Sequence, residues 1–186
     1  MLDKIINNCM GSALYNGIAN LLNGKTLTIE FNNTPGSSFS FDGSTAGISL
    51  GTNMESNHLF HEMWHVYQAY GETTQSFRQS VLNLEVEAFY AQYLYVSILP
   101  EFNGSKWENW YLNDPLMGSI QNIEDYVNPK GNLKPGKTNE ALDLHILNGA
   151  KAAFETRDEY RGKTYDYNRT GLNNFKNMKE LTKNCP

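Results

Sequence analysis

Basic side chains are scarce in this sequence of 186 residues, and their scarcity limits the partners that it can bind. Lysine and arginine number 15 against 20 aspartates and glutamates, so the formal net charge is −5, and the pI is near 5.4. Nucleic-acid binding requires a basic surface that neutralises phosphates. We therefore expect no nucleic-acid partner.

Long apolar runs are also missing. No stretch approaches the roughly 18 consecutive apolar residues of a transmembrane helix, so we expect no membrane span. Residues 1–25 lack the continuous apolar segment of a signal peptide. We interpret them as part of the folded domain, either in a mature secreted protein or in a module excised from a larger bacterial protein. The length of 186 residues predicts a single domain over residues 1–186 with a substantial core. Hydrophobic residues make up 40% of the chain, which indicates a globular rather than a disordered protein.

Cysteine is rare, with only Cys9 and Cys185 near the two ends. Cysteine-rich structural zinc sites use closely paired cysteines, and this chain has no such pair. The two thiols either form a disulfide or remain free and buried. A glycine-rich phosphate-binding loop and a convincing Ser/His/Asp order are missing as well, which leaves no signature of nucleotide binding or serine hydrolysis.

The N-terminal part is predicted to be one helix followed by a small sheet. Residues 2–22 carry apolar side chains at helical spacing, with Gly11 as the expected bend or break. Residues 25–31, 38–41 and 47–51 are rich in β-branched or alternating apolar side chains and are separated by turn-forming residues. Each of these three segments is therefore expected to be a strand.

Helical spacing returns after residue 51. Thr52 and Glu55 fit a capping box, which predicts a helix to about Tyr70 that ends at Gly71. Three further segments follow: a helix over 76–99 with a second capping box at Ser76, a structured loop with short helical turns over 101–136, and a helix over 138–154 capped by Thr138. This order predicts an α+β fold with a helical and loop-rich C-terminal part over 100–186.

Two of the four histidines lie within the motif His61-Glu62-Met63-Trp64-His65, in the middle of a predicted helix. Residues four apart share one face of a helix, so His61 and His65 present two imidazoles to one point, as a tetrahedral zinc site requires. Glu62 is rotated by about 100° from His61, and its carboxylate can act as a general base on a water bound to the metal. The motif therefore predicts one catalytic Zn²⁺ per chain.

A third protein ligand has to come from another segment. One class of HExxH enzymes uses a histidine six residues after the second histidine, where this chain has Gly71. The next predicted helix offers Glu85 and Glu87, which point roughly 200° apart, so only one of them faces the metal. We favour Glu87, because the small side chains of Ala88 and Ala91 beside it allow the two helices to approach closely. Glu85 remains the alternative.

The strands, the HExxH helix and the glutamate helix together resemble a gluzincin-type zinc metallopeptidase, in a minimal zincin form, over residues 25–99. The resemblance implies hydrolysis of a peptide or protein substrate by the zinc ligands His61, His65 and Glu87 and the base Glu62. It also implies that strand 47–51 is an edge strand that pairs with an extended substrate. Compact domains of this kind also occur among bacterial effectors and toxin modules.

The match departs from the thermolysin-like members in one respect. Those enzymes carry an aspartate four residues after the ligand glutamate, where it supports a histidine ligand, and this chain has Ala91 there. The residue that supports a histidine is therefore expected elsewhere. Gln68, one helical turn after His65, either hydrogen-bonds a histidine or substrate or occupies polar space.

Other side chains offer further roles. His58 lies one turn before His61, but a three-histidine site would leave Glu62 without a purpose. Enzymes of this type often steady the oxyanion with a downstream histidine, tyrosine or arginine, for which the candidates are His145, Tyr165 and Tyr167.

Two rival functions stay open at this point. One is a zinc hydrolase that acts on an amide other than a peptide bond, and the other is a binding or interaction domain in which the metal is structural. Glu62 discriminates between a catalytic and a structural metal, because a structural site does not need an acid at this position and usually closes with four protein ligands.

Overall fold

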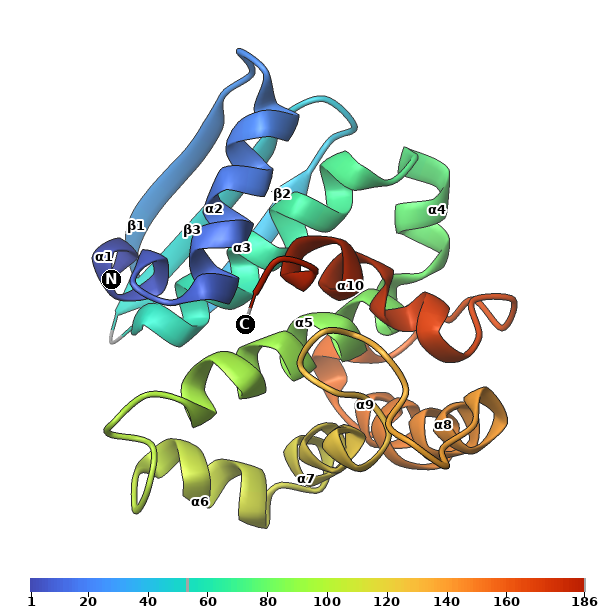
Figure 1. Cartoon of the computed structure of the whole chain (residues 1–186). Helices are drawn as coiled ribbons and strands as arrows, with labels where there is room; N and C mark the ends of the chain where they lie inside the picture. Colours follow the sequence, from blue (N-terminus) through green and yellow to red (C-terminus); the bar gives the residue numbers. More distant parts are fainter. Residues whose placement is uncertain (53, 186) are drawn as a thin grey trace.

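The chain folds into successive layers, as shown by the computed structural model, which describes residues 1–52 and 54–185 (Figure 1). A three-stranded sheet packs against α3, α3 packs against α5, and α5 packs against α7 in the C-terminal part. The fold is α+β, as predicted. Up to the end of α5 the elements are α1 (Leu2–Ile6), α2 (Cys9–Leu22), β1 (Leu27–Pro35), β2 (Ser37–Phe41), β3 (Ala46–Thr52), α3 (Ser56–Gly71), α4 (Thr74–Gln79) and α5 (Val81–Ser97).

The C-terminal part is built from short helices joined by turns. They are α6 (Lys106–Asn113), α7 (Pro115–Gln121), η1 (Asn122–Asp125), α8 (Asn139–His145), η2 (Ile146–Lys151), α9 (Ala152–Glu155), η3 (Asp158–Tyr160), η4 (Gly171–Phe175) and α10 (Lys176–Thr182). The predicted cap at Thr138 is confirmed, because its side chain accepts a hydrogen bond from the backbone of Ala141 at 3.2 Å. Within the described ranges, no helix combines the length and the apolar character that a membrane span requires.

The N-terminal helix breaks earlier than predicted. Asn8 caps α2, because its side chain accepts a hydrogen bond from the backbone of Gly11 at 2.8 Å. The glycine has a different role from the expected bend. A Cβ at position 11 would lie 2.0 Å from the carbonyl oxygen of Ile5, so only glycine allows α1 to fold back so closely against α2.

The sheet has the order β1-β3-β2, with β1 parallel and β2 antiparallel to β3. The prediction that strand 47–51 is an edge strand is therefore wrong: β3 is central, because β1 pairs with its other side. The alternating residues Ala46, Ile48 and Leu50 of β3 are buried, as a central strand packed on helices requires. The strand edge next to α3 belongs to β2.

The two central helices begin differently from the predicted capping boxes. Asn53 of the first box lies outside the described residues, and α3 starts one turn later with Glu55 as its N-cap and His58 at N3. The helix predicted over 76–99 is divided into α4 and α5, because Thr73 caps α4 and Ser80 leaves the helical conformation.

A disulfide joins Cys9, at the start of α2, to Cys185, after α10. It closes nearly the whole chain into one loop, because the two cysteines are separated by 176 positions in sequence. Helix α10 packs on α2 and α3, so the C-terminal segment lies against the helix that carries the HExxH motif (Figure 1).

Candidate metal centre

His61 and His65 of α3 and Glu85 of α5 form one cluster. The Nε2 atoms of the two histidines lie 3.1 Å apart. The Oε2 atom of Glu85 lies 3.4 Å from Nε2 of His61 and 3.5 Å from Nε2 of His65. Both histidines are buried, and Glu85 is nearly so. Among the described residues these three side chains are the group whose donor atoms converge on a single point.

The spacing of these donors fits a zinc ion. Zinc holds nitrogen and oxygen ligands at about 2.0–2.1 Å in a tetrahedron, whose edge is then about 3.3 Å. The three observed separations, 3.1, 3.4 and 3.5 Å, bracket this value. The Glu85 Oε2 atom is buried, with no hydrogen-bond donor among the described residues, and a cation would supply the missing partner.

The charges of the cluster are strongly coupled. Burial alone would lower the pKa of His65, but the Glu85 carboxylate, together with Glu62 and the hydrogen bond to Gln68, outweighs burial and raises the pKa to about 9. Burial alone would raise the pKa of Glu85, but His65 and His61 hold this pKa well below its ordinary range. The site therefore favours positive charge at the point where the three side chains meet.

The preference for Glu87 as the third ligand has to be corrected. Glu87 points away from the histidines and accepts hydrogen bonds from the side chain of Gln68 at 3.0 Å, the side chain of Asn177 at 2.7 Å and the backbone of Met178 at 2.9 Å. The rotation of α5 about its axis directs Glu85 toward His61 and His65 of α3 instead.

Glu62 lies beside the cluster, as the motif predicts, and is 5% exposed. Its Oε1 atom accepts a hydrogen bond from the hydroxyl of Ser37 in β2 at 2.6 Å. Glu62 is therefore tied to the edge strand β2, while both histidines line the same cleft.

A cleft of about 350 Å³ opens above these residues. Its walls come from β2, from the apolar side chains of α4 and α5, and from the turn around Tyr160 in the C-terminal part. The residues that line it are Ser37, Ser38, Phe39, His61, Glu62, His65, Phe77, Val81, Leu84, Glu85, Glu159, Tyr160 and Lys163. The cleft is therefore half apolar, and the three side chains of the candidate metal cluster are part of its lining.

Tyr160 was missed by the sequence reasoning. Burial, followed by the negative charges of Glu85 and Glu159, raises the pKa of its phenol, which therefore stays protonated and able to donate. No local pattern marks this residue, because the polar tail around it has no periodicity. Only the fold brings it to the HExxH helix.

The three predicted oxyanion residues do not line the cleft. His145 bonds through Nε2 to the carbonyl of Ser119 at 2.8 Å and stacks on Tyr126. Tyr165 and Tyr167 pack edge to face and line a separate hollow.

His58 is also outside the cluster. Its Nδ1 atom accepts the backbone N–H of Glu55 at 3.1 Å and so completes the cap of α3. A three-histidine metal site is not formed.

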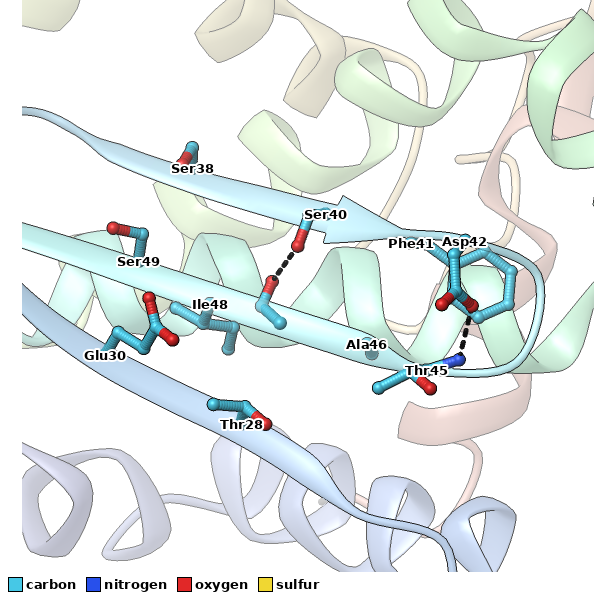
Figure 2. A pocket seen from close by; sticks show the side chains of 11 residues that line it. Thr28, Glu30, Ser38, Ser40, Phe41, Asp42, Thr45, Ala46, Ile48 and Ser49 are labelled. Carbon is cyan, nitrogen blue, oxygen red and sulfur yellow. Dashed lines mark hydrogen bonds between the residues drawn. The ribbon is translucent and has the colours of Figure 1, made fainter.

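A second hollow, of about 430 Å³, lies on the face of the sheet turned away from α3 (Figure 2). Thr28, Glu30, Ser38 and Ser49 project into it, and Ser40 bonds to the carbonyl of Gly47 (Figure 2). Polar side chains project into this hollow, but it contains no group of converging metal ligands in the described part of the chain.

Comparisons with protein-family models, with curated proteins and with solved structures returned no match.

Proposed function

We propose that this protein is a zinc-dependent peptidase whose metal ligands are His61, His65 and Glu85. The observation that carries the proposal is the convergence of three donors at tetrahedral spacing, with Glu62 beside them in the lining of a cleft. A structural metal would need neither the open cleft nor the adjacent carboxylate.

His61, His65 and Glu85 would hold the zinc, which would supply a Lewis acid and lower the pKa of a bound water. Glu62 is placed to take up a proton at its carboxylate and to return it to the leaving amine, so that one side chain would serve as base and then as acid. The Ser37 hydroxyl donates a hydrogen bond to Oε1 of Glu62 and holds the carboxylate in place. Oε2 of Glu62 then remains to accept the proton.

The edge of β2 provides a place for the substrate backbone. Among the described residues, β2 pairs only with β3, so the other edge of Ser37–Phe41 has no strand partner there. An extended peptide can add to such an edge as a further strand. Because Ser37, Ser38 and Phe39 also line the cleft, a peptide in this position would lie over the metal ligands.

The apolar wall and Tyr160 complete the assignment. Phe39, Phe77 and Val81 offer a surface for an apolar side chain of the substrate. The neutral phenol of Tyr160 can donate a hydrogen bond to the oxygen that gains negative charge as the carbonyl is attacked.

A metal analysis coupled to a digest of a peptide library tests this proposal. We expect one zinc ion per chain, and a strong chelator should remove the zinc and the cleavage together. Two tightly held zinc ions would contradict the mononuclear site. One zinc ion without cleavage of any peptide would support a structural metal instead.

A further inference from the structure

A buried chain of hydrogen bonds runs from His65 away from the cleft. His65 Nδ1 lies 2.8 Å from Oε1 of Gln68. The other end of that amide, Nε2, donates to the carbonyl of Leu84 and to Oε2 of Glu87, both at 3.0 Å. Gln68 and Glu87 are both fully buried.

This chain determines the orientation of the Gln68 amide. Nε2 of an amide can only donate and Oε1 can only accept. Leu84 O and the Glu87 carboxylate are both acceptors, so the amide must turn its Nε2 toward them and its Oε1 toward His65. His65 must then carry a proton on Nδ1, so Nε2 is the nitrogen that can give a lone pair to a cation at the point shared with His61 and Glu85.

Glu87 is itself held firmly. Asn177 Nδ2 and the backbone of Met178, both from α10, donate to it at 2.7 and 2.9 Å, and Arg169 lies 4.0 Å away. Burying a carboxylate is costly unless it is paired and hydrogen-bonded, and these contacts offset that cost. No comparable support exists for the other histidine, because Nδ1 of His61 has no hydrogen-bond partner in the described part of the chain.

We infer that Gln68 and Glu87 are positioning residues that hold His65 as the Nδ1-protonated tautomer and so raise the affinity of the site for zinc. This inference rests on the metal site proposed above. It also assigns a role to the buried glutamate that sequence reasoning took for a ligand.

The test compares the zinc affinity of folded variants by competition with a chelator. Gln68→Met keeps the length of the side chain and removes its hydrogen bonds, so zinc binding should weaken by about 10- to 100-fold. Glu87→Gln keeps the shape but replaces the acceptor that orients the amide, and a loss of up to about tenfold is expected.

Asn83→Leu is the matched control. Asn83 is another fully buried amide, and it links α5 to Asn174 and Asp166 of the C-terminal segment without reaching His65. Asn83→Leu should lower the melting temperature but leave the zinc affinity of the folded protein unchanged. If Gln68 had only a structural role, Gln68→Met would behave in the same way.

Nitrogen NMR of the zinc-loaded protein supplies a second readout. His65 of the wild type should show a proton on Nδ1 that is protected from exchange, and Gln68→Met should lose that protection. Equal zinc affinity of the wild type and Gln68→Met would overturn the positioning role while the metal site stands. A wild type that binds no zinc would overturn both proposals.

Discussion

The identity of the third ligand gives the sharpest quantitative prediction, which concerns Glu85→Gln and Glu87→Gln. Both substitutions keep the size of the side chain, and the two residues lie on the same helix. Only Glu85 has an oxygen within 3.5 Å of both Nε2 atoms. Glu87 acts on the site only through Gln68.

The expected size follows from the number of ligands. Complete four-ligand zinc sites bind with about 10–16 kcal/mol, or about 3 kcal/mol for each ligand. Water replaces a lost ligand and recovers part of this, so Glu85→Gln should weaken zinc binding by about 100-fold, or about 2.7 kcal/mol. Glu87→Gln should cost no more than about tenfold.

Competition with a chelator of known affinity measures both values, and circular dichroism confirms that each variant is folded. If Glu87→Gln lost far more affinity than Glu85→Gln, the rotation of α5 described above would be wrong.

Three further predictions concern the cleft, the ends of the chain and the response to acid. Tyr160→Phe should lower kcat by about 10²–10³-fold with little change in KM, as expected for one oxyanion donor, and Tyr165→Phe, outside the cleft, should leave both constants unchanged; equal kinetics for the two variants would remove Tyr160 from the mechanism. The double variant Cys9→Ser/Cys185→Ser should lose up to about 5 kcal/mol of unfolding free energy, measured by urea denaturation, because the disulfide closes a long loop with a sequence separation of 176. An unchanged urea midpoint would contradict a stabilising role of the disulfide. The Glu72 carboxylate is buried and lies 2.8 Å from Arg169. Burial alone would raise the pKa of Glu72, but Arg169, Lys176 and Ser76 together outweigh burial and lower this pKa. The ionised Glu72 therefore stabilises the fold fully above about pH 4.5, and this stabilisation is lost as the pH falls through the lower pKa of the folded state. Glu72→Gln should therefore be less stable at neutral pH and show a flatter loss of stability in acid, and a parallel pH profile would refute this.

The parts of the structure that sequence could predict are those that depend on neighbours in the chain. His61 and His65 share a face because of helical geometry alone, and the cap at Thr138 is a contact over three residues. The three strands also follow from local alternation, and their bounds agree with the predicted segments to within a few residues.

The choice between Glu85 and Glu87 was beyond local pattern. Helix α5 is buried on almost every side from Leu82 to Val96, so it has no polar face that could indicate its rotation. The donors that bury Glu87 come from α10, at the far end of the chain. Ala88 and Ala91 are buried, but their small size did not indicate which of the two glutamates faces α3.

Strand order and Tyr160 depend on the fold as a whole. Strand β3 is central because β1 pairs with it in parallel, although β2 lies between these two strands in the sequence. The sequence of a single strand does not specify this order. Tyr160 reaches the cleft only after the C-terminal part has packed against α5.

The central claim is that Glu62 works on a water beside a metal held by its neighbours, and the measurement that tests it most directly is the hydrolysis rate of zinc-loaded Glu62→Gln. The substrate is a peptide identified from the library digest, and zinc content is measured on the same sample. Glu30→Gln, an exposed carboxylate on β1, is the matched control.

Glu62→Gln should keep one zinc ion per chain, because no ligand is changed, and should lose about 10²–10⁴-fold in rate, because the proton acceptor is gone. Glu30→Gln should cleave like the wild type. A zinc-loaded Glu62→Gln that cleaves as fast as the wild type would contradict the account.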